Sequence, residues 1–549
     1  MKKELIEKLI GADVKDISYW ADKFSPRPEG QVVSRVGPSP TGFMHLGNIY
    51  AALIPYTFTH QNKGVFFLRI EDTDTKRKVE GAVDLVISSL KAFGINADEG
   101  PINEGEEKGA YGPYHQSQRA DIYKSGIKML LEKDLAYPCF ATEEDIEALR
   151  KEQTALKLRP GYYGKWAKCR NLTEEQIEEN LSKGMPFVFR FRASGNHETK
   201  KYFTDLVKGK IQMPENDMDI VIMKSDGLPT YHFAHVMDDH FMGTTHVIRA
   251  DEWLASMPLH VQMFESIGWK VPNYAHIAPI QKLDEGNRRK LSKRKDPEAN
   301  ISYYFEQGYP VEAVKEYLIN LANSSFEDYK KAHPENALET FEFKLENLNV
   351  SGALLDFKKL ENISKEFIAT LSSADLYNRI LTWAESYDKS FADKLRANAD
   401  YIKSILGIER DGAEKVRKDY YIFSKISDEI SYFFDDDFKL TKEDLLSQSP
   451  LSENLTKDIV KQYLASFDFN HNKEEWFNNI KDLAAKNGFA KNPKERDKNP
   501  ELYAGKGTVS DIATIVRLLI TGRTQSPDLH AIIQILGKDR TLKRLSLLD

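Results

Sequence analysis

A turn rich in glycine and proline, followed by a histidine, is the part of the sequence best suited to bind a phosphate. Residues 35–48 read RVGPSPTGFMHLGN; they follow a strand predicted over 31–36 and run into a helix predicted to begin near His45. Small residues let backbone N–H groups approach a nucleotide closely, and a helix N-terminus favours an anionic phosphate. His45 could donate a hydrogen bond to phosphoryl oxygens as charge develops on them. The alternative is an ordinary turn with a surface histidine, which the length of the motif disfavours.

A basic stretch later in the chain could bind the other end of a polyphosphate. Residues 281–295 contain seven Lys or Arg and two acids, a local net charge of +5, and include KLSKR at 290–294. A flexible basic loop suits a triphosphate whose leaving pyrophosphate accumulates charge. A solvated loop or a patch for the RNA backbone is the alternative. Because the stretch follows an α/β region that already carries a phosphate-binding turn, we favour the first interpretation.

Charged side chains that could bind a small amino acid follow predicted strands. Glu71 comes directly after the apolar run at 65–70, and ligand-binding groups gather at such strand ends in open α/β sheets. A carboxylate facing an ammonium group would form a charge-assisted hydrogen bond. Arg35 and Arg249 are the arginines that we assign to substrate carboxylates, because the planar guanidinium binds a carboxylate at two points. A structural ion pair is the alternative for either arginine.

The composition limits the class of protein. The 549 residues include 77 Lys and Arg, 84 Asp and Glu and two Cys, and the net charge is −7. This length predicts several domains, and so few cysteines suit a reducing, cytoplasmic location. No secretory signal or apolar run of about 18 residues is present, so we expect no membrane contact. The negative net charge does not exclude a nucleic acid, since residues 491–549 carry 11 basic and seven acidic residues, a local charge of +4.

The helices and strands that must position these residues fall into regions that differ in their predicted secondary structure. Residues 31 to about 300 mix apolar strands with helical patterns, which predicts an α/β domain. Strands are predicted at 65–70, 220–223, 245–248 and 275–280, as parts of a parallel sheet covered on both faces. A different block over 114–217, with a helix at 142–156 and a strand at 187–191, looks like an insertion. From about residue 309 amphipathic helical periodicity dominates.

Taken together, these motifs resemble those of class I aminoacyl-tRNA synthetases. His45–Asn48 (HLGN) is similar to the family's HIGH element, and KLSKR at 290–294 is similar to its KMSKS loop. RIEDTD at 69–74, PTYHFA at 229–234 and VIRADEW at 247–253 narrow the resemblance to glutamyl-tRNA synthetases of bacterial type. The resemblance covers about residues 31–549.

The resemblance implies an ATP-dependent ligase. It would activate L-glutamate with ATP and Mg²⁺ to glutamyl-adenylate and transfer it to the 3′ end of tRNA(Glu), releasing AMP and pyrophosphate. The resemblance also implies a monomer. A glutaminyl-tRNA synthetase is the closest alternative, but its C-terminal half is built of β-barrels. A catalytically silent RNA-binding descendant of a synthetase and a small-molecule nucleotidyltransferase are alternatives of other classes.

The implied fold is a Rossmann-like α/β catalytic domain with an inserted α+β acceptor-binding domain, followed by an all-α anticodon-binding region. The expected boundaries are an N-terminal helical extension at 1–30, the two halves of the catalytic domain at 31–113 and 218–308, the acceptor-arm insertion at 114–217, a helical stem-contact domain at 309–385 and an anticodon-binding domain at 386–549. We assign no function to the extension.

The resemblance also implies roles for individual residues. Those expected to act in catalysis are His45, Asn48, Lys290 and Lys293. Those expected to bind glutamate are Arg35, Gly37, Ser39, Glu71, Tyr231, His235 and Arg249. Those expected to bind ATP are Thr41, His45, Gly47, Glu252 and Lys293.

Three features depart from the family pattern. His235 stands where many members have Asn, so its contacts need a structure. Some members bind zinc through a Cys-x-Cys pair and a later Cys-x-His; here those positions are Cys139, Ala141, Cys169 and Asn171. Two thiols cannot complete a tetrahedral site, so no zinc is predicted. Pro55 lies inside the helix after His45 and is predicted to kink or break it.

Overall fold

The computed structural model describes all residues except 41, 43, 75–78, 293, 336 and 549. The chain divides into two compact units. Unit 1 comprises Met1–Tyr303 and Lys315–Asp356, and unit 2 comprises Tyr304–Val314 and Phe357–Asp549. Each unit has a hydrophobic core of its own.

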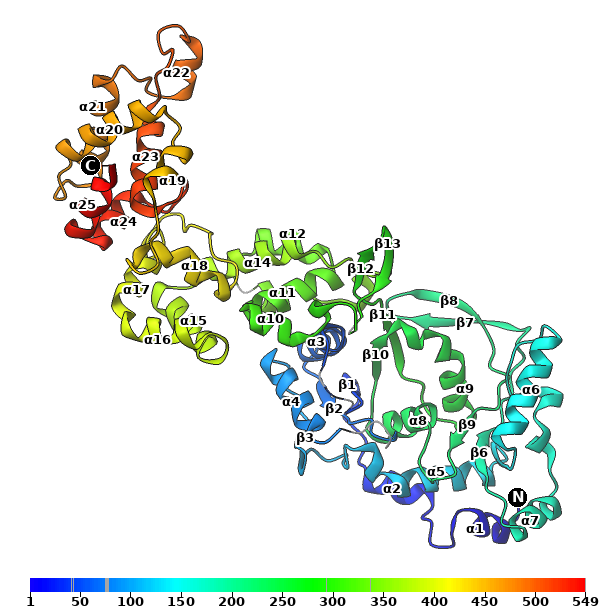
Figure 1. Ribbon diagram of the computed structural model, residues 1–549. Helices are drawn as coiled ribbons and strands as arrows, with labels where there is room; N and C mark the ends of the chain where they lie inside the picture. The colour runs from blue at the N-terminus through cyan, green and yellow to red at the C-terminus, as the bar shows by residue number, and fades with distance from the viewer. Residues whose placement is uncertain (41, 43, 75–78, 293, 336, 549) are drawn as a thin grey trace. The chain divides into compact units, whose positions relative to one another are not determined.

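Unit 1 combines helices and short strands (Figure 1). Its helices are α1 (Lys3–Ile10), α2 (Ile17–Lys23), α3 (Leu46–Gln61), α4 (Ala82–Ala92), α5 (Ala120–Glu132), α6 (Glu143–Ala155), α7 (Glu174–Ser182), α8 (Tyr231–Phe241), α9 (Met257–Ile267), α12 (Ser325–Ala332) and α13 (Ala337–Thr340). Its strands are β1 (Val33–Val36), β2 (Val65–Leu68), β3 (Gly100–Asn103), β4 (Glu106–Lys108), β5 (Ala136–Cys139), β6 (Val188–Phe191), β7 (Lys200–Asp205), β8 (Gly209–Pro214), β9 (Val221–Met223), β10 (His246–Ala250), β11 (Asn273–Ile277), β12 (Gln281–Asp284) and β13 (Asn287–Lys290).

Two parallel strand pairs form the frame of the site. β1 pairs with β2, with Arg35 opposite Phe67, and β10 pairs with β11, with Arg249 opposite His276. The backbone N–H of Thr245 donates to the carbonyl of Val33 at 3.0 Å, which joins the two pairs. The strands predicted at 65–70, 245–248 and 275–280 are thereby confirmed within a few residues, although β11 ends at Ile277. Their parallel direction brings the segments that follow β1, β2 and β10 to the same edge.

The prediction of a parallel strand at 220–223 was wrong in its pairing. β9 runs antiparallel to β6, in a three-stranded sheet with the order β5-β6-β9. A short apolar run does not distinguish a parallel strand from an antiparallel one, which explains the error. In its place the hairpin β7–β8 extends the other sheet, whose order is β10-β11-β7-β8, and Asp205 at the end of β7 lies opposite Tyr274.

Helix α3 continues through Pro55, so the predicted break does not occur. Proline removes one backbone donor from the helix interior. Eight of the sixteen residues of α3 are buried, and the helix packs against β1, β2 and β10, which outweighs the lost hydrogen bond. The helix predicted at 142–156 is confirmed as α6, and Thr142 caps it by accepting a hydrogen bond from the backbone N–H of Asp145.

The first thirty residues belong to the core of unit 1. Leu5, Ile6 and Leu9 are buried where α1 packs on α5, and the indole Nε1 of Trp20 donates to Ser125 Oγ at 2.8 Å. The two N-terminal helices therefore pack on α5 as part of the core of unit 1.

Among its described residues unit 2 contains helices and no strand, as the periodicity predicts. They are α14 (Phe357–Thr370), α15 (Ser373–Tyr387), α16 (Lys389–Ala397), α17 (Ala399–Leu406), α18 (Ile426–Ile430), α19 (Lys442–Gln448), α20 (Glu453–Ser466), α21 (Lys473–Lys486), α22 (Pro493–Lys498), α23 (Val509–Thr521), α24 (Leu529–Leu536) and α25 (Lys538–Leu545). Helices α10 (Ile301–Gln307) and α11 (Val311–Ala322) include residues of both units. In the described part of the chain, no helix is both long and apolar enough to cross a bilayer.

Candidate active site

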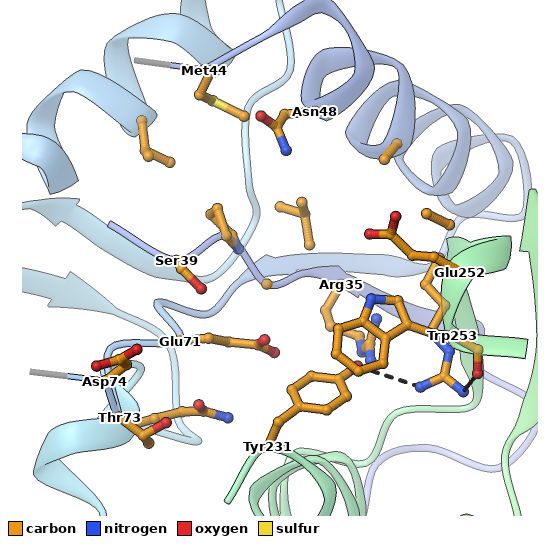
Figure 2. A pocket seen from close by; sticks show the side chains of 18 of the residues that line it. Arg35, Ser39, Met44, Asn48, Glu71, Thr73, Asp74, Tyr231, Glu252 and Trp253 are labelled. Carbon is orange, nitrogen blue, oxygen red and sulfur yellow. Dashed lines mark hydrogen bonds between the residues drawn. The ribbon is translucent and has the colours of Figure 1, made fainter. Parts of the chain in front are cut away.

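A cavity of about 840 Å³ lies at the edge of unit 1 where β1, β2 and β10 end (Figure 2). Most of the predicted site residues line it: Arg35, Gly37, Ser39, His45, Asn48, Glu71, Tyr231, Arg249 and Glu252. Gly47, His235 and Lys290 are not among its lining residues. Thr41 and Lys293 lie outside the described residues.

His45 caps the helix that begins the phosphate motif. Its Nδ1 accepts a hydrogen bond from the backbone N–H of Asn48 at 3.2 Å, and the Asn48 amide oxygen accepts one from the backbone N–H of His45 at 3.1 Å. A neutral His45 therefore carries its proton on Nε2. A Cβ on Gly47 would lie 2.8 Å from His45 Cε1, so glycine at this position leaves room for the imidazole ring. The structure thus gives Gly47 a steric role instead of a place in the cavity wall.

Glu71 enters the cavity from the end of β2, and Tyr231 and Trp253 lie across from it (Figure 2). Its carboxylate accepts a hydrogen bond from Arg69 Nη2 at 3.0 Å. Burial raises the pKa of Glu71 although Arg69 opposes that effect. A Cβ on Gly37 would lie 2.3 Å from Glu71 Oε1, so only glycine permits this approach.

Asp239 lies behind Glu71 and joins two buried arginines. It accepts hydrogen bonds from Arg35 Nε and Nη2, each at 3.1 Å, and from Arg69 Nη1 at 2.7 Å. Burial would raise the pKa of Asp239, but Arg35 and Arg69 hold it well below its usual range. Arg35 therefore lines the cavity, but its guanidinium already forms an ion pair with Asp239. This is the structural ion pair that the sequence analysis gave as the alternative to substrate binding.

His235 belongs to the same buried network. Its Nδ1 lies 2.7 Å from Asp239 Oδ2, and its Nε2 lies 3.0 Å from the hydroxyl of Tyr274. Both ring nitrogens are therefore engaged by protein groups, and the side chain has no exposed surface. The structure does not bring His235 to the cavity, in contrast to the expectation that it binds glutamate.

Arg249 differs from the other buried arginines because neutral groups surround it. Its Nε lies 3.0 Å from His276 Nε2, its Nη2 lies 3.2 Å from His260 Nδ1 and 3.3 Å from the carbonyl of Trp253, and its Nη1 lies 3.4 Å from the Tyr231 hydroxyl. Arg249 is only 6% exposed. Among the described residues, no carboxylate forms an ion pair with it.

The histidines near Arg249 are neutral at pH 7. Burial, reinforced by Arg249, lowers the pKa of His232 to about 4 and holds the pKa of His260 well below its usual range. Burial also lowers the pKa of His276, against the effect of Asp205. Within the described part of the chain, the cavity wall therefore contains a buried cation that has no ion-pair partner. Desolvated charges are costly unless they are paired, so this position favours a ligand with a carboxylate.

We expect these histidines to make the stability of unit 1 depend on pH. Burial lowers the pKa of His235 to about 3, whereas an unfolded histidine has a pKa of about 6.5. Between these values the unfolded state binds more protons, so stability falls as pH decreases below about 6.5, by up to about 1.4 kcal/mol per pH unit for each such histidine. Urea unfolding of unit 1 from pH 7 to pH 5 measures this slope. His235→Asn should make the free energy of unfolding depend less steeply on pH. An unchanged slope would contradict the lowered pKa of His235.

Residues 281–290 of the basic stretch form the hairpin β12–β13, and part of their charge is paired with acidic residues. Arg289 donates to Asp296 at 2.6 Å, and this buried aspartate lies just beyond the stretch whose charge was counted. Lys290 forms an exposed ion pair with Glu252 of the cavity wall. The first ten residues of the predicted basic loop are therefore a hairpin with acidic partners, and the described residues after Lys290 form no strand.

The two cysteines are both free and lie close to one tyrosine. The thiol of Cys139 lies 3.4 Å from the hydroxyl of Tyr162, which accepts a hydrogen bond from the backbone N–H of Cys169 at 3.0 Å. The described residues contain no group of three or more His, Cys, Asp or Glu side chains that could hold a metal ion.

Several residues around the site were not predicted from the sequence. They are Arg69, Asp205, Asp239, His260 and His276. The spacing of four residues between His235 and Asp239 on α8 was a usable signal, because such residues lie on one helix face. The others meet only through tertiary structure.

Comparisons with known proteins agree with this geometry. Residues 31–362 match the family described as tRNA synthetases class I (E and Q), catalytic domain, and residues 506–548 match an anticodon binding domain. A glutamate–tRNA ligase from Clostridium perfringens (strain 13 / Type A) is 44% identical, over 99% of this chain and 100% of its own. One from Sorangium cellulosum (strain So ce56) is 41% identical, over 94% and 95%.

A solved structure shares the fold. The crystal structure of a glutamate tRNA ligase from Elizabethkingia meningosepticum CCUG26117, in complex with its amino acid, superposes with a TM-score of 0.74 and 28% identity, over 94% of this chain and 98% of that chain. The chain therefore belongs to the class I tRNA synthetases of the E and Q type.

Proposed function

We propose that this protein is a glutamate–tRNA ligase that activates L-glutamate with ATP and transfers it to tRNA(Glu). The observation that carries the proposal is Arg249, a buried guanidinium in the cavity wall surrounded by neutral acceptors. The side-chain carboxylate of glutamate would supply the missing negative charge. The neutral amide of glutamine would leave the guanidinium underpaired, which disfavours the glutaminyl alternative.

The remaining contacts of glutamate are proposed from the cavity wall. Glu71 would bind the α-ammonium group through a charge-assisted hydrogen bond, and Gly37 leaves room for its carboxylate. Tyr231, whose ring centroid lies 4.1 Å from that of Trp253 with the two planes tilted by 32°, would form the floor beneath the substrate side chain. Arg35 and Ser39 line the same wall. Arg35 would act mainly through its ion pair with Asp239.

The phosphates of ATP would lie toward the N-terminus of α3. His45 and Asn48 line that side, and a helix N-terminus favours anions. The α-carboxylate of glutamate attacks the α-phosphorus, pyrophosphate leaves, and the terminal ribose hydroxyl of tRNA then displaces AMP from the acyl carbon. Positioning and electrostatic stabilisation would supply most of the rate, with Lys290, Lys293 and Mg²⁺ neutralising the leaving phosphates. Glu252 would bind the ribose of ATP after releasing Lys290.

The rest of the chain would bind tRNA. The segment 114–217 would contact the acceptor arm, and the helices from residue 309 onward would contact the stem and the anticodon. Basic residues of the last segment are the expected phosphate contacts, apart from those that are already paired, such as Arg523 with Glu429 and Arg544 with Asp435. A cytoplasmic monomer with no zinc remains the expectation from the resemblance.

Pyrophosphate exchange tests the proposal. The protein should exchange pyrophosphate into ATP with glutamate in the presence of tRNA(Glu), and the family resemblance implies no exchange without tRNA. Exchange that occurs with glutamine but not with glutamate would favour a glutaminyl-tRNA synthetase. No exchange under any condition would favour the catalytically silent protein.

A further inference from the structure

Arg249 is held by buried side chains that lie outside the cavity. His276 accepts from its Nε at 3.0 Å and His260 accepts from its Nη2 at 3.2 Å. Both histidines are fully buried, and neither lines the cavity. These two contacts, with the carbonyl of Trp253, occupy the Nε and Nη2 side of the guanidinium. The Nη1 side, next to the Tyr231 hydroxyl, is left for a ligand.

The donors of Arg249 determine the tautomers of both histidines. A guanidinium only donates hydrogen bonds, so each nitrogen that faces it must be unprotonated. For His276 this places the proton on Nδ1, which donates to Asp205 Oδ2 at 2.6 Å. For His260 it places the proton on Nε2, which donates to His232 Nδ1 at 2.9 Å. Each histidine is thus oriented by a further partner.

Asp205 is itself fixed by the pairing of β7 with β11. Its Oδ1 accepts hydrogen bonds from the backbone N–H groups of Val207 and Lys208 at 2.9 and 2.8 Å, and its Oδ2 accepts one from the backbone N–H of His276 at 3.0 Å. The carboxylate is 1% exposed. Strand pairing therefore sets the position of the Asp205 carboxylate, and the carboxylate selects the tautomer of His276. In this tautomer His276 accepts a hydrogen bond from Arg249 and orients the guanidinium.

We propose that His276 and His260 are positioning residues that fix the guanidinium of Arg249 for a substrate side chain ending in a carboxylate. Asp205 and His232 select the tautomers that make this possible. The inference rests on the proposed function, since it concerns how glutamate is selected. Neutral acceptors orient Arg249 without cancelling its charge, whereas a carboxylate in direct contact would compete with the substrate.

Two substitutions of His276 separate positioning from general packing. His276→Phe keeps a ring but removes the acceptor, and loss of one hydrogen bond to a charged group predicts a rise of about 10- to 100-fold in the KM for glutamate. Values of kcat and of the KM for ATP should stay within about threefold, because the lost interaction is made equally in the ground state and the transition state. His276→Gln retains an acceptor near the Nε2 position and should restore most of the affinity.

Asp205→Asn tests the tautomer directly. An asparagine oxygen can still accept from the backbone N–H groups of Val207 and Lys208, but the amide NH2 would replace Oδ2. It would remove the acceptor of the His276 backbone N–H, and at Nδ1 it would favour the tautomer with the proton on Nε2, where that proton opposes Arg249. The same change of tautomer is damaging when the aspartate of a catalytic triad is replaced by asparagine. The KM for glutamate should rise as in His276→Phe. His240→Phe, a half-buried histidine that stacks on Trp269 away from this cluster, is the matched control and should behave as wild type.

All variants are measured in the full-length protein by charging of tRNA(Glu). A selective rise in the KM for glutamate in His276→Phe and Asp205→Asn, with recovery in His276→Gln, supports the inference. If wild type charges tRNA and His276→Phe keeps a wild-type KM for glutamate, or loses kcat and ATP affinity equally, the inference is wrong while the proposed function stands. If wild type does not use glutamate at all, the proposed function fails, and the inference fails with it.

Discussion

Replacing Arg249 by alanine is expected to reduce kcat/KM for glutamate by about 30- to 4,000-fold, because removing one partner of a buried, hydrogen-bonded charge pair costs about 2–5 kcal/mol. The KM for ATP should change little, since the α3 side of the cavity is untouched. Charging of tRNA(Glu) at varied glutamate and varied ATP measures both effects.

The same substitution should have little effect on stability. Arg249 is a buried cation with no carboxylate partner among the described residues, so its removal relieves a desolvation cost while it breaks several hydrogen bonds. We expect the free energy of unfolding to change by less than about 2 kcal/mol. Arg249→Lys, which keeps the charge but loses the planar fork, should lie between alanine and wild type in glutamate use. Unchanged glutamate kinetics in Arg249→Ala would refute the assignment.

In contrast to Arg249→Ala, replacing Asp239 by asparagine is expected to lower the free energy of unfolding strongly. Asp239 is the shared carboxylate of Arg35 and Arg69, which are buried almost completely. Without its charge Arg35 loses its ion pair, while Arg69 keeps Glu71 at 3.0 Å and Asp238 at 3.8 Å. Breaking a buried ion pair in this way costs about 3–5 kcal/mol. Urea unfolding of unit 1 measures the change. Activity should fall as well, because Arg69 holds Glu71 at the cavity.

Asp134→Asn is the matched control for this prediction. Its side chain is 77% exposed and pairs with Arg192 at 3.3 Å. Exposed ion pairs contribute about 0–1 kcal/mol, so the free energy of unfolding should hardly change. If Asp239→Asn were as mild as Asp134→Asn, the buried network would not stabilise unit 1 as we describe.

The parts of the site that depend on local sequence could be predicted. A strand over 31–36 and a helix that begins near His45 were predicted from an apolar run and small turn residues, and the structure places β1 and α3 there. Glu71 was predicted because it follows a strand, and parallel strands bring such positions to one edge. Arg35 was predicted because its planar guanidinium can bind a carboxylate at two points. The structure puts both in the cavity wall with Arg249.

The parts that depend on tertiary contacts could not be predicted. Asp205 and His276 are 71 residues apart and meet only because β7 pairs with β11, whereas residues 200–205 carry no clear strand pattern. His235 was predicted to bind substrate from its position after Tyr231. Only the packing of α8 shows that its ring nitrogens are engaged by Asp239 and Tyr274. The charge counted over 281–295 likewise left out Asp296, which lies just beyond the stretch and pairs with Arg289.

The central claim is that the buried guanidinium of Arg249, which forms no ion pair with any described residue, makes this enzyme select a carboxylate side chain. The most direct measurement is the identity of the amino acid esterified to tRNA when purified protein, ATP, tRNA(Glu) and equal concentrations of glutamate and glutamine react together. Glutamyl-tRNA should be the product, with no detectable glutaminyl-tRNA. Formation of glutaminyl-tRNA in comparable amounts would contradict the claim.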